Sequence, residues 1–356
     1  MNETSVQPKD VQKTDSQDEF LKGGIPDGSV NITKLIGFFG GLFLFLLMVL
    51  SSPPEGLSLK GWRTAAVATL MATWWVTEVI PIAGTALLPI ILFPLLGVLD
   101  VSASAAPYAN PMIYLFLGGF IIAIAMKRWN LHRRIALNII AFIGSKPRNI
   151  IAGFIVSSAF MSMWVSNTAA TLMMLPIALS VIELTKTGSQ SQEEKKEYRN
   201  FAIALMLAIA YSANIGGIGT VIGTPTNALM IAFVEEAYGM EVAFVQWMSL
   251  GVPLVLLGLP IIFYTLVNLI FPVHLQSLPG GREYIEAEIK RLGKISKPEM
   301  TVAIVFVIVA TLWIIRPLLE NTIPGLSDAG IAIFGALLLF MIPVDLRKAR
   351  FLLRWK

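Results

Sequence analysis

Hydroxyl and amide side chains are concentrated in one short stretch of an otherwise apolar segment. The stretch SMWVSNTAAT (162–171) places five such residues within ten positions, namely Ser162, Ser166, Asn167, Thr168 and Thr171. Hydroxyl groups both donate and accept hydrogen bonds, and the asparagine amide does so with separate atoms. Donors of this kind suit a carboxylate and the oxygens suit a small hard cation, so the stretch has the chemistry of an ion-binding site.

A second polar stretch, YSANIGGIGTVIGTPTN (211–227), interrupts another apolar segment. It contains four glycines and a proline among serine, threonine and asparagine residues. Each glycine costs a helix about 1 kcal/mol relative to alanine, so we predict a helix that is unwound in its middle. Non-helical backbone at membrane depth is tolerated only where it is buried or lines a cavity, and paired broken helices mark transporter binding sites.

The composition of the chain indicates a membrane protein. Of its 356 residues, 55% are hydrophobic and 14% charged, against about 25% charged residues in soluble domains. Without cysteine, and with His132 and His274 as the two histidines, disulfides, thiolate metal sites and multi-histidine centres are not expected. We predict an all-α polytopic membrane protein.

Apolar runs long enough to cross a bilayer predict the spans. They fall at about 32–50, 62–80, 82–98, 112–126, 201–233, 247–271, 300–316 and 329–343. Residues 1–31 have the polarity of a flexible tail and lack the order of a signal peptide. The basic, periodic segment 127–148 is typical of an interfacial helix. Glu78, between two spans, is either an acid at the membrane surface or part of a proton relay.

The basic residues predict the orientation. All but three of the 27 lysines and arginines fall at the N-terminus up to Lys34 or in four segments, which are 127–148, 185–199, 272–297 and 344–356. By the positive-inside rule these segments and the N-terminus are cytoplasmic. The basic patches then meet lipid headgroups of the bilayer, and no nucleic-acid partner is expected.

The apolar segment 149–184 lies between two of these cytoplasmic segments, so it must enter the membrane and return. Its arms are short for full crossings and its tip, residues 166–168, has no charge. We predict a re-entrant helical hairpin with its tip inside the protein. Two full spans, with Trp164 as an interfacial anchor, are the alternative. Polar residues that serve only in helix packing are a second one.

The predicted hairpin places helix ends at its tip. The second arm begins near Asn167, where free N–H groups favour a carboxylate. Carbonyls at the end of the first arm suit Na⁺. Such a site needs no buried cationic side chain, and we expect none.

Four motifs resemble the divalent anion/sodium symporter family of sodium-dicarboxylate cotransporters, over about residues 32–356. They are FMSMWVSNTAATLMMLPIALSV, YSANIGGIGTVIGTPTNAL, TWWVTEVIPIAGTALLPIILFPLLGVL and LFLGGFIIAIAMKRWNLHRRIAL. The resemblance implies two inverted repeats, each with a re-entrant hairpin and a broken helix, and homodimers that work by an elevator-like movement.

The resemblance also implies roles for particular residues. Ser166, Asn167 and Thr168 would contact a substrate carboxylate, and Thr224 and Pro225 would border the substrate. A sodium site would be formed by Ser162, Ser166, Asn167 and the carbonyl of Gly223.

One departure from the family pattern concerns its second hairpin and second broken helix, for which no matching residues are found here. We therefore expect a C-terminally truncated member with an incomplete second repeat. The predicted parts are a tail (1–31), scaffold spans (32–148), part of a transport domain (149–271, with hairpin 149–184, broken helix 201–233 and span 247–271), and a loop with two spans of the second repeat (272–356).

The expected function is uptake of C4-dicarboxylates (succinate, malate, fumarate) across the cell inner (cytoplasmic) membrane, with Na⁺ as coupling ion and no organic cofactor. Alternatives are a non-transporting membrane fragment and a dicarboxylate exchanger without Na⁺ coupling. An enzyme is disfavoured because no paired carboxylates, histidine cluster or activated nucleophile stands in the apolar segments. The full-length form is expected to be a homodimer.

Overall fold

The computed structural model describes residues 32–185, 191–278, 280–346 and 350–355, so the predicted tail lies outside it. It divides into two compact units, one up to Ala109 and one from Asn110 onwards. This division reflects compactness and does not test which parts move during function. The predicted division into scaffold and transport parts therefore stays a prediction.

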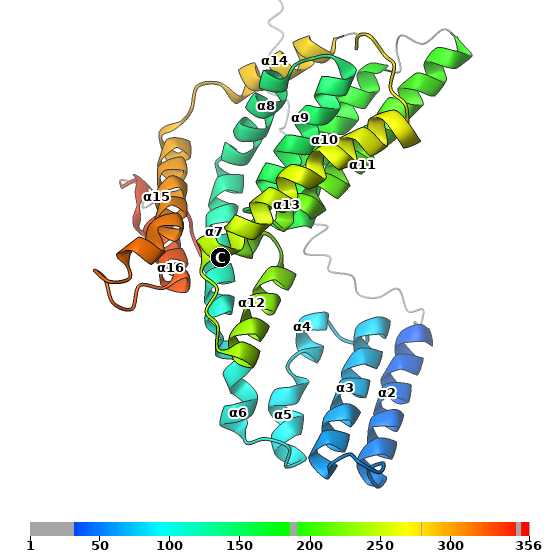
Figure 1. Ribbon diagram of the computed structural model, residues 1–356, viewed down its shortest axis with the longest axis vertical. Coiled ribbons are helices and arrows are strands. Elements are labelled where there is room, and N and C mark those ends of the chain that lie inside the picture. Colours follow the sequence, from blue (N-terminus) through cyan, green and yellow to red (C-terminus); the bar gives the residue numbers. More distant parts are fainter. Residues whose placement is uncertain (1–31, 186–190, 279, 347–349, 356) are drawn as a thin grey trace, which may run out of the picture. The chain divides into compact units, whose positions relative to one another are not determined.

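The first unit is a small helical bundle (Figure 1). Its elements are α2 (Ile32–Leu50), α3 (Leu59–Thr77), α4 (Ile82–Thr85), α5 (Leu88–Leu95), α6 (Val101–Ala105) and the 3-10 turn η1 (Ala106–Ala109). The helices α2 and α3 pack as an antiparallel pair around a core of Phe45, Ala66, Val67, Leu70 and Trp74. Glu78 caps the C-terminus of α3 in a left-handed conformation and is exposed.

The helix predicted over 82–98 is interrupted, while its crossing of the membrane stays a prediction. The segment forms two short helices, because Pro89 lacks an amide donor and its ring would clash with the carbonyl of Thr85 in a continuous helix. Pro94, inside α5, adds a second interruption. The short helices α6 and η1 after this segment were not predicted from the sequence.

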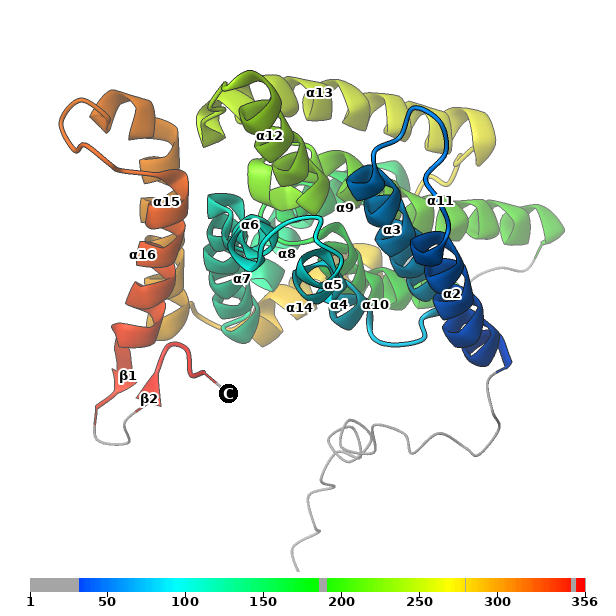
Figure 2. The ribbon, with the colours of Figure 1, turned by 90° about the horizontal axis from the view of Figure 1, so that it is seen from below.

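The second unit contains the helices from α7 onwards, in an arrangement seen from two sides in Figures 1 and 2. They are α7 (Pro111–Arg128), α8 (Leu131–Ile143), α9 (Pro147–Ser162), α10 (Asn167–Thr185), α11 (Gln192–Gly217), η2 (Val221–Gly223), α12 (Pro225–Tyr238), α13 (Phe244–Tyr264), the π-helical η3 (Thr265–Ile270), α14 (Gly281–Leu292), α15 (Lys297–Leu319) and α16 (Asp328–Met341). A short antiparallel pair follows, β1 (Pro343–Asp345) with β2 (Arg350–Phe351).

Small residues let the helices of this unit approach closely. Gly216 of α11 lies on the backbone of Ala159 in α9, and Gly118 of α7 lies on that of Ala332 in α16. A side chain at either glycine would push these helices apart. The amphipathic helix α14 was not predicted within the loop 272–297, and it packs beside α8.

Five segments in the described part of the chain are long and apolar enough to cross a membrane. They are Ile32–Leu50, Val101–Arg128, Gln192–Gly217, Phe244–Ile270 and Lys297–Leu319. Their surfaces expose large apolar side chains, such as Phe43 (64%) and Leu257 (65%). An all-α polytopic membrane protein is confirmed, while α10 and α16 remain shorter apolar helices.

Candidate functional site

The predicted helical hairpin is present, formed by α9 and α10. The first arm ends at Ser162 and the second begins at Asn167. Between them, Ser166 caps the second arm, since its Oγ accepts a hydrogen bond from the N–H of Ala169 (3.4 Å). The Ser166 hydroxyl hydrogen is left for another acceptor.

Asn167 is held from two sides. Its Oδ1 accepts a hydrogen bond of 2.7 Å from the hydroxyl of Ser162, which is fully buried. Its Nδ2 donates a bond of 3.1 Å to Oδ1 of Asn214 on α11. The amide is therefore oriented by protein groups, while the residue remains partly exposed.

The predicted break in the polar stretch 211–227 is also present. The helix α11 ends at Gly217 and α12 begins at Pro225, with only the turn η2 between them. Gly217 lies against the Asn167 side chain, and Gly223 lies against the backbone of Gly217. These contacts leave no room for a Cβ, which explains glycine at both positions.

Hydrogen bonds from two side chains stabilise the conformation of the break between α11 and α12. Asn227 is buried, and its Nδ2 donates hydrogen bonds of 2.8 Å to the carbonyls of Gly217 and Thr220. The hydroxyl of Thr220 donates to the carbonyl of Met163 in the hairpin turn. Hairpin tip and helix break thus form one connected structure.

The ends of four helices meet at this structure. Two are C-terminal ends, at Ser162 and Gly217, which carry negative partial charge. Two are N-terminal ends, at Asn167 and Pro225, which carry positive partial charge. Carbonyl-rich ends suit a cation and amide-rich ends suit an anion, so the arrangement can hold both.

The donor set fits a monovalent cation such as Na⁺. Ser162 Oγ and Asn167 Oδ1 are neutral oxygens beside helix C-termini, and hard cations prefer oxygen ligands. Among the described residues, no group of three or more His, Cys, Asp or Glu could hold a metal ion. Such neutral surroundings suit a single positive charge better than two.

The structure places the residues expected at the site as follows. Ser162, Asn167 and Gly223 are joined through Gly217 into one cluster. Thr168 is exposed in the first turn of α10. Thr224, directly after Gly223, has its hydroxyl 3.2 Å from that of Thr226, and Pro225 is exposed at the start of α12.

The sequence analysis missed Asn214, Thr220 and Asn227 as parts of the site. All three lie within the stretch already singled out for its glycines. Amide and hydroxyl side chains next to a helix break have unpaired backbone groups to bind, and that signal could have identified them.

The interpretation of Trp164 as an interfacial anchor is wrong. Its side chain is 8% exposed and stacks on Phe244, with ring centroids 6.4 Å apart, and meets Phe306 edge-on at 4.8 Å. Phe244 in turn stacks on Trp313 at 4.5 Å. Trp164, just before the hairpin tip, therefore packs in an aromatic cluster inside the protein, while the re-entrant course of the hairpin through the membrane stays a prediction.

A buried cationic side chain is present elsewhere in the second unit, apart from the residues expected at the site. Arg316 of α15 is 6% exposed and pairs with Glu241 (2.6 Å) and with the buried Asp328 (3.4 Å). Asp328 also accepts the backbone N–H of Phe244 (2.8 Å). Pairing makes burial of the guanidinium tolerable, because an isolated charge would be far more costly.

A polytopic helical membrane protein with a helical hairpin, a broken helix and neutral oxygen donors at their junction has the architecture of secondary transporters. The profile of the sodium:sulfate symporter transmembrane region matches residues 32–356, and the chain belongs to that family. The family expected from the hairpin and broken-helix motifs is confirmed.

Two relatives show how much of the chain is shared. The sodium-dependent dicarboxylate transporter SdcS of Staphylococcus saprophyticus subsp. saprophyticus is 42% identical over 318 residues, which are 88% of this chain and 61% of the relative. SdcS of Staphylococcus aureus (strain USA300) is 41% identical over 327 residues, 91% of this chain and 63% of the relative. The chain thus spans less than two thirds of the length of these relatives.

Proposed function

We propose that this protein takes up C4-dicarboxylates such as succinate, malate and fumarate together with Na⁺. The observation that carries the proposal is the placement of Asn167 between Ser162, Asn214 and Gly217, where helix ends of both polarities meet. The names of the SdcS relatives, which are sodium-dependent dicarboxylate transporters, support the choice of ion and substrate.

In this proposal each part of the site has a role. Ser162, Ser166, Asn167 and the Gly223 carbonyl bind Na⁺, while Ser166, Asn167 and Thr168 bind one substrate carboxylate. Thr224 and Pro225 border the substrate. Na⁺ next to the carboxylate offsets the charge of the dianion, so each ligand strengthens binding of the other.

We also propose the cellular setting. The protein lies in the cytoplasmic membrane with a cytoplasmic N-terminus, works as a homodimer and moves its transport part (149–271) as an elevator against the scaffold (32–148). The charge distribution supports the orientation, and the resemblance to the family supports the dimer and the movement.

Ligand-dependent thermal stability of the purified chain tests the proposal. A ligand that binds only the folded state raises the melting temperature with its concentration. We expect Na⁺, but not K⁺, to do so, and succinate to add stabilisation only when Na⁺ is present. Asn167→Ala should abolish both effects, whereas Asn138→Ala, an exposed asparagine on α8, should keep them.

Succinate uptake gives the second readout. Asn167→Ala should lower uptake far more than it lowers the amount of protein in the membrane. Uptake by the variant at the level of the unchanged protein would show that the polar residues of the tip serve helix packing and do not bind substrate. Uptake that is indifferent to Na⁺ would favour a dicarboxylate exchanger.

A further inference from the structure

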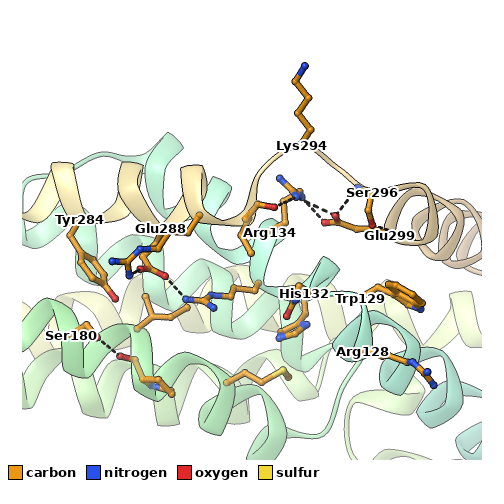
Figure 3. A pocket seen from close by; sticks show the side chains of 17 residues that line it. Arg128, Trp129, His132, Arg134, Ser180, Tyr284, Glu288, Lys294, Ser296 and Glu299 are labelled. Atoms are coloured by element: carbon orange, nitrogen blue, oxygen red, sulfur yellow. Dashed lines mark hydrogen bonds and ion pairs between the residues drawn. The ribbon is translucent and has the colours of Figure 1, made fainter. Parts of the chain in front are cut away.

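A cavity of about 910 Å³ in the second unit is lined by carboxylates that pair with arginines (Figure 3). Glu288 accepts hydrogen bonds from Arg133 and, at 2.6 Å, from Arg291. Glu299 accepts two hydrogen bonds from Arg134, at 2.5 and 3.2 Å. These ion pairs join α8 to α14 and to the start of α15, so the carboxylates of this cavity have a structural role.

At the hairpin tip, by contrast, Asn214 is an exposed amide close to the C-terminal end of α11. This helix is one of the segments that are long and apolar enough to cross a membrane. An amide that faced lipid would lack hydrogen-bond partners, which is costly. The exposed side of Asn214 is therefore suited to water or to a polar ligand.

The oxygen and the nitrogen of the Asn167 amide have different neighbours. Its Oδ1 accepts the hydroxyl of Ser162 and lies against Gly217, at the C-terminal ends of α9 and α11. Its Nδ2 donates to Oδ1 of Asn214 (3.1 Å). A cation between the two helix ends needs the amide oxygen on that side, because these ends carry negative partial charge and hard cations bind oxygen. The observed orientation of Asn167 meets this need.

Ser162 alone does not set this orientation. A hydroxyl can donate to the oxygen of an amide or accept from its nitrogen, so Ser162 satisfies Asn167 in either orientation. The acceptor on Asn214 draws the Asn167 nitrogen away from the cation side. Both hydrogen bonds of Asn167 can persist in the loaded state, because Oδ1 has a second lone pair for the cation and Nδ2 has a second hydrogen.

The amide nitrogen of Asn214 itself is unused. It donates to no acceptor within the described part of the chain, and the residue is exposed. Its amide oxygen binds Asn167, the first residue of α10, so the nitrogen of the same amide lies close to the start of that helix. Free N–H groups and positive partial charge at a helix start favour an anion. A carboxylate bound there can accept a hydrogen bond from Asn214.

We propose that Asn214 is a positioning residue for the bound Na⁺ and a contact for the substrate carboxylate. Its Oδ1 holds the Asn167 amide with the oxygen toward the cation, and its Nδ2 donates to the carboxylate at the start of α10. One side chain thus serves both ligands through its two different atoms. The inference rests on the proposed function, since it adds a residue to the same site.

Two substitutions separate these roles when thermal stabilisation of the purified chain is measured against Na⁺ and succinate concentration. Asn214→Ala removes the acceptor and the donor, so the Na⁺ concentration for half-maximal stabilisation should rise about five-fold, and the added effect of succinate should be lost. Asn214→Asp keeps an acceptor, so this Na⁺ concentration should stay the same or fall. Succinate should nevertheless add nothing in Asn214→Asp, because the donor is lost and a like charge is added.

Asn138→Asp is the matched control, because it makes the same chemical change at an exposed asparagine that is bonded within its own helix α8. It should leave the effects of Na⁺ and succinate unchanged. Because Asn214 is exposed, its variants should keep ligand-free melting temperatures close to that of the unchanged chain. Unchanged ligand effects in Asn214→Ala, or an equal loss of Na⁺ affinity in Asn214→Ala and Asn214→Asp, would overturn the inference and leave the proposed function standing. Absence of any stabilisation of the unchanged chain by Na⁺ would overturn the proposed function and this inference with it.

Discussion

Gly217 lies so close to the side-chain amide of Asn167 that an added Cβ would stand 3.0 Å from its Cγ and 3.1 Å from its Nδ2. We predict that Gly217→Ala displaces this amide from Ser162 and Asn214. Overpacking of this kind costs about 1–3 kcal/mol, so the apparent affinity for Na⁺ in thermal stabilisation should fall roughly ten-fold or more. Gly40→Ala in α2, where no atom lies within 4 Å, is the control and should change nothing.

We predict that loss of the Asn227 side chain destabilises the protein. Asn227→Ala leaves the carbonyls of Gly217 and Thr220 without their buried donor, which should cost about 1–3 kcal/mol of unfolding free energy. Denaturant titration in detergent measures this loss. Asn138→Ala, exposed on its own helix, should stay within about 0.5 kcal/mol. Equal losses of unfolding free energy in the two variants would contradict the role of Asn227 in stabilising the helix break.

The hairpin can be tested by labelling, because the chain has no cysteine. Single cysteines at Lys146 and Glu193, exposed on either side of the hairpin, should react with an impermeant maleimide from the same face of the membrane. A cysteine at Glu55, exposed between α2 and α3, should react from the other face. Labelling of Lys146 and Glu193 from opposite faces would rule out a re-entrant hairpin.

Substitutions of Arg316 and of its exposed partner Glu241 should differ in their cost in unfolding free energy. Arg316→Met strands a buried carboxylate and should cost about 3–5 kcal/mol. Glu241→Gln affects a carboxylate with 64% of its side chain exposed and should cost about 1 kcal/mol or less. The double variant Arg316→Met/Asp328→Asn should regain much of the loss, which a double-mutant cycle would quantify.

His132 makes stability depend on acid pH. Burial lowers its pKa below the ordinary 6.5, and nearby Lys127 and Arg133 act in the same direction, against the bond to the Met126 carbonyl. The unfolded state therefore binds a proton at a higher pH, and stability should fall as the pH drops below about 6.5. In His132→Gln the melting temperature should fall less as the pH drops below about 6.5. His274→Gln, at an exposed position, should show the same fall as the unchanged protein.

The polar cluster could be predicted from the sequence because its signals are local. Ser162 and Asn167 are five positions apart in an apolar segment, and the glycines of the broken helix stand close together. Such density has few explanations within a membrane helix. The family resemblance rested on these two stretches together with two further motifs.

Hydrogen-bond and ion-pair partners that lie far apart in the sequence could not be predicted from it. Asn214 lies 47 positions from Asn167, and Arg316 lies 75 positions from Glu241, so only the packing of the helices brings them together. Hydropathy alone also did not reveal the break between α4 and α5, since it does not weigh the effect of Pro89 on the backbone.

The bonds of Asn227, Thr220 and Ser162 have an entropic consequence. They fix the carbonyls of the break and the amide of Asn167 during folding, so these groups would have little conformational freedom left to lose in the proposed binding of an ion. Thr168 and Pro225 are exposed in the first turns of their helices. The cost of ordering on binding should therefore fall mainly on the bound molecule rather than on the protein.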